Sequence, residues 1–125
     1  MRLLITAIAT TIVLSSSVYA ESARDTTSKI RFDLNQLDEF GLYGPEDGKR
    51  SLSYEFCVPN DLQAIETVQA IDPSIVIYLH SPGRVGCDKM EVLAIGETHQ
   101  PNYRAVLIDL ANLDSIERIE QFWGE

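Results

Sequence analysis

The feature that most constrains the fold is a pair of apolar runs, residues 75–79 and 90–95, joined by a loop rich in glycine and proline. Apolar runs bounded by such turn residues predict a β-hairpin. The loop reads Ser-Pro-Gly-Arg-Val-Gly-Cys-Asp over residues 81–88, and it holds Cys87, one of the two cysteines of the chain. The hairpin therefore offers a crosslinking point to the segment that holds the other cysteine, Cys57.

The N-terminus predicts export. Residues 1–20 begin with Met1 and Arg2, continue through an apolar stretch over residues 3–14, and close on small residues up to Ala20. This order is typical of a secretory signal peptide. The apolar stretch is shorter than the roughly 20 residues of a membrane span, so we expect no stable membrane insertion. The predicted location is the periplasm or the medium.

Charge narrows the range of partners. The formal net charge is −9, and loss of residues 1–20 would remove Arg2 but no acidic residue, which gives about −10. Nucleic acids and anionic membrane surfaces select for basic patches, so neither is an expected partner of this acidic protein.

Two cysteines in an exported chain predict one disulfide bond. Cys57 and Cys87 are far apart in sequence and do not form a Cys-x-x-Cys redox motif. A bond between them would stabilise a small domain by about 3–4 kcal/mol.

The chain divides into a flexible N-terminal arm, residues 21–48, and a single α+β domain, residues 49–125. Ile30, Phe32 and Leu34 alternate with polar residues and predict an accessory strand in the arm. A cluster of turn residues at 44–48 separates the arm from the domain.

Within the domain, hydrophobic periodicity predicts a strand over residues 51–58 and a helix over 62–71, with Asn60 as its N-cap. After the hairpin, three- and four-residue spacing predicts a second helix from about residue 101 to 113, then a strand over 116–123. The alternative makes 104–110 a strand and the end of the chain a helix, in the order βαβββα.

The preferred order, βαββαβ, is that of a ferredoxin-like sandwich, an antiparallel sheet with two helices on one face. Its right-handed crossover places the end of the first strand and the hairpin loop at the same edge of the sheet. Cys57 and Cys87 occupy these two places, so the topology and the disulfide support each other.

The hairpin loop is also a candidate ligand site. Arg84 lies between Gly83 and Gly86, with His80 at the end of the preceding strand. Backbone amides in such a loop can form an anion-binding nest, although Pro-Gly also marks an ordinary turn. His80 and His99 fall at opposite edges of the predicted sheet and cannot share a metal, and we expect neither a metal nor another cofactor.

The open face of the sheet is a candidate partner surface. If the helices cover the other face, Val76, Tyr78, Leu93 and Ile95 lie together on the uncovered one. Soluble proteins seldom leave such a patch unused. We expect it to be covered by the arm or by a second protein, either a periplasmic partner or another copy in a homo-oligomer.

The stretches Ser-Leu-Ser-Tyr-Glu-Phe-Cys-Val-Pro at 51–59, Gly-Arg-Val-Gly-Cys at 83–87 and Ile-Gly-Glu-Thr-His-Gln-Pro at 95–101 carry a family resemblance. Over residues 41–125 the chain resembles small exported proteins of photosynthetic bacteria to which no activity is assigned. The resemblance implies one small domain behind a signal peptide.

Together these patterns predict a disulfide-stabilised binding or interaction module of unknown ligand. The alternative is a small periplasmic hydrolase or transferase that uses the Arg84 loop with Glu55 or His80.

Overall fold

The computed structural model describes residues 26–124, so the predicted signal peptide lies outside the described residues. The chain has a mixed α+β fold, as the sequence predicts. Its elements are η1 (Leu34–Gln36), β1 (Leu42–Tyr43), β2 (Arg50–Ser51), β3 (Ser53–Pro59), α2 (Leu62–Ile71), β4 (Val76–Tyr78), β5 (Glu91–Glu97), α3 (Tyr103–Ala111) and β6 (Glu120–Phe122).

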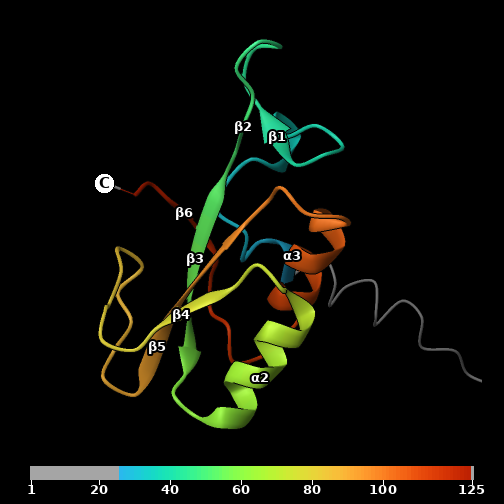
Figure 1. Ribbon diagram of the computed structural model, residues 1–125. Coiled ribbons are helices and arrows are strands. Elements are labelled where there is room, and N and C mark those ends of the chain that lie inside the picture. Colours follow the sequence, from blue (N-terminus) through green and yellow to red (C-terminus); the bar gives the residue numbers. More distant parts are fainter. Residues whose placement is uncertain (1–25, 125) are drawn as a thin grey trace, which may run out of the picture.

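Two antiparallel sheets organise these elements. The larger has four strands in the order β4-β5-β3-β6, and every neighbouring pair is antiparallel. The smaller consists of β1 and β2. Both α-helices lie on the same side of the larger sheet (Figure 1). The other face is therefore left to the loops.

The alternation of β3 divides its side chains between the two faces. Tyr54, Phe56 and Val58 are fully buried in the core under the helices, whereas Glu55 and Cys57 point to the other face. The predicted strand over residues 51–58 is divided, because Leu52 bonds to Thr98 between β2 and β3. β2 then pairs with β1 instead of with the larger sheet.

Helix α2 begins one residue later than its predicted cap implies. Asp61, not Asn60, is the N-cap, and its carboxylate accepts a hydrogen bond of 2.8 Å from the Ala64 N–H. Asn60 instead donates its N–H to the Met90 carbonyl, which keeps it attached to the end of β5. Either residue type is a good N-cap, so this neighbouring strand decides between them.

Helix α3 and strand β6 follow the preferred order, and the alternative βαβββα arrangement is wrong. Tyr103, Leu107 and Leu110 recur at helical spacing and are buried against the sheet. β6 pairs with β3, so it forms one edge of the larger sheet.

The N-terminal segment, residues 26–41, packs beside α3 and β6. The accessory strand predicted there is reduced to one parallel bridge, between Ile30 and Ile119. The chain then leaves the sheet because Phe32 stacks on Tyr54, with ring centroids 6.2 Å apart, and η1 begins two residues later. Leu37 is buried in the same core, although the predicted domain boundary comes after it.

Candidate functional site

The strand register places four residues of the predicted partner face side by side. Val76 lies opposite Ile95, and Tyr78 lies opposite Leu93, on the face that the helices leave open. Ile77, between them, points toward the core. The shared face is thus a property of the structure, while its role in binding stays a prediction.

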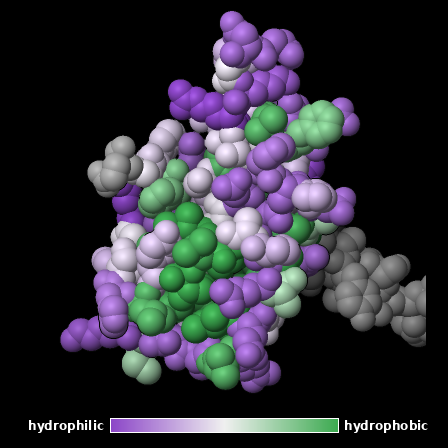
Figure 2. All heavy atoms as spheres, in the orientation of Figure 1, coloured by the Kyte–Doolittle hydropathy of each residue, from purple (hydrophilic) through white to green (hydrophobic). Residues whose placement is uncertain are grey.

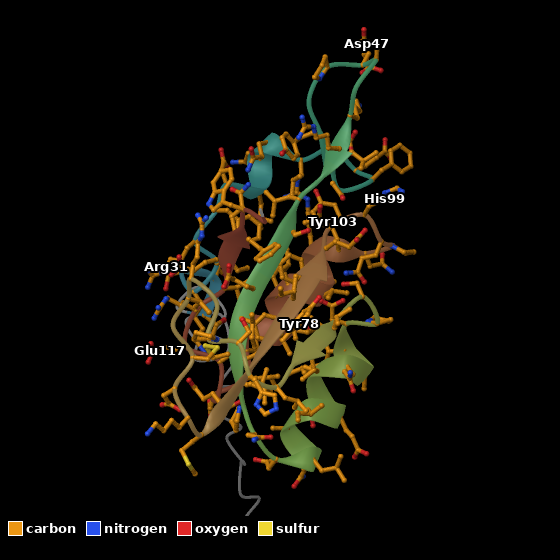
Figure 3. The ribbon with its side chains drawn as sticks, turned by 60° about the vertical axis from the view of Figure 1, so that its left-hand side comes forward. Arg31, Asp47, Tyr78, His99, Tyr103 and Glu117 are labelled. Carbon is orange, nitrogen blue, oxygen red and sulfur yellow. A yellow bond between two sulfur atoms is a disulfide. The ribbon has the colours of Figure 1, made fainter. Side chains whose placement is uncertain are left out.

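A cover loop, residues 79–90, folds back over part of this face. The disulfide between Cys57 and Cys87 ties the loop to β3, with the two Cα atoms 5.4 Å apart, and confirms the predicted pairing. In Figure 3 the yellow sulfur–sulfur bond lies close to the labelled Glu117. The cover loop therefore lies over part of the open face that we expected the arm or a partner to cover.

Buried polar contacts fix the middle of the cover loop. The Val85 N–H donates to Glu55 Oε1 over 3.2 Å, and Arg118 donates to the Val85 carbonyl. Val85 is buried, and Glu55 is completely buried beneath the loop. Among the described residues, Oε2 of Glu55 is the one buried side-chain polar atom without a hydrogen-bond partner.

Gly83 allows the cover loop to approach the sheet closely. Its φ is +66°, and a Cβ atom there would lie 2.5 Å from Glu55 Oε1 and 2.7 Å from Leu93 Cδ1. Only glycine fits this backbone conformation and this contact without displacement. The loop consequently seals Leu93, which is buried, away from solvent.

The rest of the open face stays accessible along β4. Val76 is 52% exposed and Tyr78 44%, and Leu79, the first residue of the cover loop, is 58% exposed directly after the strand. Ile95, beside Val76, is half-buried. We call Val76, Tyr78, Leu79 and Ile95 the β4 surface. Figure 2 shows a continuous hydrophobic area over β4, which Figure 1 draws in front of β5 in the same orientation.

The predicted arm does not cover the β4 surface. Its apolar residues Ile30, Phe32 and Leu34 pack against the core cluster that the helices also cover. Arg104 of α3 donates to the carbonyls of Leu34 and Leu37 and holds the segment there. The alternation of apolar residues in the arm suggested that it would lie on the open face of the sheet. Its contacts with α3 and Ile119 place it instead beside β6, at the edge opposite β4.

The ligand loop predicted from Gly83, Arg84, Gly86 and His80 forms a turn. Gly86 and Cys87 both donate their N–H groups to the Pro82 carbonyl, over 3.1 and 2.8 Å. With the Val85 N–H committed to Glu55, these three amides have protein acceptors and do not form an anion nest. Arg84 and His80 are exposed, so the structure does not bring either into a closed site with Glu55.

A small cavity of about 180 Å³ lies beside the disulfide, between the cover loop and the chain before β6. Cys57, Asp88, Glu91 and Arg118 contribute to its wall. Both sulfur atoms nearest Glu91 are bonded to each other, so they supply no thiolate to a metal. Arg118 already pairs with Glu117 and Glu120. The disulfide sulfur atoms and Arg118 are therefore already engaged with protein groups and are not free to bind a ligand in this cavity.

A buried network of hydrogen bonds holds the segment that leads into β4. Tyr54 donates its hydroxyl to Asp72, which also accepts from Ser74 and Gln100. Burial, followed by the charge of Asp72, raises the pKa of Tyr54 above its ordinary value of 10.0. No pattern in the sequence predicts this contact, because Tyr54 and Asp72 come from different elements.

Asp38, just before β1, makes structural contacts. Asp38 accepts N–H bonds from Phe40 and Leu42, and pairs with Lys49 over 2.8 Å. The hydrogen bond from Lys49, with the backbone donors, lowers the pKa of Asp38 to about 2. These contacts shape the turn that leads into β1.

Comparison with known proteins adds no relative. No family model matches the chain, and neither a curated protein nor a solved structure is significantly similar to it. Within residues 26–124, no helix is long and apolar enough to cross a membrane.

Proposed function

We propose that this protein is an exported interaction module that binds a partner protein through the β4 surface. The observation that carries the proposal is the exposure of Val76 and Tyr78 on the open face of β4, with the exposed Leu79 directly after the strand. Large apolar side chains that gather on a surface mark interaction sites, whereas isolated ones need no explanation.

Two features support export. The signal-peptide pattern of residues 1–20 predicts passage across a membrane, and the Cys57–Cys87 disulfide fits an oxidising compartment. We propose the periplasm as the site of action, which agrees with the resemblance to small exported proteins of photosynthetic bacteria.

We also propose that the larger sheet and its helices form a ferredoxin-like sandwich. The order β4-β5-β3-β6, with antiparallel neighbours, supports this assignment. So does the succession β3, α2, β4, β5, α3, β6, which is a split βαβ arrangement. The small β1–β2 sheet is an addition to that pattern.

A partner protein is a better occupant than a second copy. Each chain carries a formal charge of −9, so two copies repel each other. The catalytic alternative lacks support of this kind, because Glu55 is buried while Arg84 and His80 are exposed.

A photo-crosslinking residue at position 78 tests the proposal. It should capture one protein in the native periplasm, whereas the same residue at Leu62, an exposed position on α2, should not. The captured protein is then purified and its binding measured against Val76→Ser, Tyr78→Ser and Arg84→Ala variants. We expect the first two to weaken binding and the third to leave it unchanged. Equal capture at both positions, or binding indifferent to Val76 and Tyr78, would refute the proposal.

A further inference from the structure

We infer that the partner segment is an extended strand, rich in lysine or arginine, that pairs with the free edge of β4. This inference rests on the proposed function and specifies the kind of partner that the β4 surface takes. Three observations lead to it: the position of β4 in the sheet, the side chains on its two faces, and the distribution of charge.

β4 stands at the end of the strand order and pairs only with β5 among the described residues. A strand in this position presents unpaired backbone groups to which another strand can bond. Proteins protect such edges with charged residues, proline, bulges or very short strands. β4 is short, with three residues, but residues 75–79 contain no charged residue and no proline, and all five are apolar or aromatic.

The opposite edge of the sheet shows how this chain covers an edge. Beside β6, the Arg31 N–H donates to the Ile119 carbonyl over 2.9 Å, and the Ile119 N–H donates to the Lys29 carbonyl over 2.8 Å. The chain thus satisfies the backbone of Ile119, directly before β6, with its own N-terminal segment. In Figure 3, Arg31 marks this edge and Tyr78 marks the uncovered one.

The open face of β4 suits an incoming strand that carries apolar side chains on one of its two faces. Val76 and Tyr78 are exposed on the open face, while Ile77 is half-buried on the helix face. Cross-strand contacts between apolar residues stabilise paired strands. An incoming strand would therefore gain side-chain contacts as well as backbone hydrogen bonds.

Charge selects a basic partner. No lysine or arginine occurs between residues 51 and 83, a stretch that includes β3, α2 and β4. The exposed charges of α2 and its cap are acidic, Asp61 and Glu66. Glu97 is also exposed, and its N–H bonds to Ser74 just before β4. Opposite charges around an interface speed association and favour the correct partner.

The test uses the whole exported protein and a short synthetic peptide of alternating lysine and valine. We expect the peptide to slow hydrogen exchange at the amides of β4, as followed by NMR, and to bind more weakly as ionic strength rises. Two matched peptides serve as controls. One replaces lysine by glutamate, and the other carries N-methyl groups that prevent backbone pairing; neither should bind.

Each departure from this result overturns a distinct statement. Equal binding of the N-methylated peptide would exclude strand pairing, and equal binding of the glutamate peptide would exclude selection by charge. Protection of β4 in a dimer without peptide, shown by sedimentation, would make a second copy the occupant. A partner captured at position 78, combined with no peptide protection, would overturn this inference and leave the proposed function standing. Peptide pairing without any captured partner would overturn the proposed function and, with it, the identification of the partner segment, although the edge of β4 would still be shown to accept a strand.

Discussion

The two edges of the larger sheet are finished in different ways. At the β6 edge, the N-terminal segment adds a parallel bridge, and its Leu37 enters the core. At the β4 edge, a covalent bond holds the cover loop over the open face, but the strand itself remains unpaired. The N-terminal segment therefore adds to the β6 edge, whereas no segment of the described residues pairs with the outer edge of β4. We interpret the difference as a division between a structural edge and a binding edge.

Hydrogen bonds to α3 and to the chain directly after it hold the structural edge. Tyr103 donates its hydroxyl to the Asp38 carbonyl over 2.7 Å, and Lys29 reaches the Leu113 carbonyl over 3.1 Å. These contacts connect residues more than sixty positions apart in the sequence. They make the N-terminal segment part of the domain core, in contrast to the exposed side chains of β4.

Removal of the disulfide should give the largest effect. We expect the double variant Cys57→Ala, Cys87→Ala to lose about 3–4 kcal/mol of unfolding free energy, because the oxidised unfolded chain is restricted by the crosslink. Denaturant titration measures the loss. Hydrogen exchange should show the β4 and cover-loop amides loosening first, while the Arg31 and Ile119 amides keep their protection. Equal loosening at both edges would contradict the distinction drawn between them.

Truncation of Leu37 tests the structural edge. This side chain is 4% exposed, so we expect Leu37→Ala to lower the free energy of unfolding by about 2–4 kcal/mol through the cavity it leaves. Leu62→Ala is the control, since Leu62 is 71% exposed and its truncation should change stability by about 0.5 kcal/mol at most. If the two variants were alike, the N-terminal segment would not belong to the core.

The Tyr54 hydroxyl offers a smaller and pH-dependent test. Tyr54→Phe should cost about 1–2 kcal/mol, because Asp72 loses a buried donor. Since burial raises the pKa of Tyr54 in the folded state, the unfolded chain releases this proton first. The contribution is therefore complete below pH 10.0, the ordinary pKa, and declines above it.

Unfolding experiments from neutral to alkaline pH check this behaviour. The wild-type protein should lose more stability above pH 10.0 than the Tyr54→Phe variant does. Because Asp72 and Ser74 lead into β4, the variant should also loosen β4 more than β6. Parallel pH curves for the two proteins would show that Tyr54 ionises as easily in the folded state as in the unfolded one.

Substitutions on the β4 surface should have the smallest effect on stability. We expect Val76→Ser and Tyr78→Ser each to change the free energy of unfolding by about 0.5 kcal/mol, because both side chains are near half exposed. Ile77→Ser, on the same strand, should cost more because Ile77 packs against the core. Thermal unfolding compares the three variants, and a large loss at Val76 would show that the β4 edge is structural as well.

The sequence was most informative where one periodic pattern determined the answer. Alternation along β3 predicted which residues face the helices, and helical spacing from Tyr103 predicted α3. The presence of two cysteines in a chain with an export signal predicted their bond, and the predicted topology placed Cys57, at a strand end, beside the loop that holds Cys87. Each of these depends on residues that are close in sequence or on a topological rule, so little tertiary information was needed.

The sequence was least informative where distant segments compete for the same partner. Ile30, Phe32 and Leu34 have the period of a strand, but contacts with Tyr54 and Arg104 direct them along the core. Glu55 stands at a position that alternation marks as solvent-facing, yet Gly83 and Val85 bury it. Neither outcome has a local signal, because each depends on a loop or helix that arrives from elsewhere in the chain.

The disulfide also has a consequence for the order of folding. It closes a ring of chain that contains α2 and β4, while the N-terminal segment and β6 lie outside the ring. In an oxidised chain the disulfide has already made one contact between distant residues. The entropic cost of bringing β3 and β5 together is therefore lower. The hydrogen bond from Thr26 to Asn112 spans 86 positions and gains nothing from the ring. We therefore expect the oxidised chain to pair its central strands early and to attach its N-terminal segment last; stopped-flow refolding of oxidised and reduced protein, with pulsed hydrogen exchange, would reveal the opposite order if it occurred.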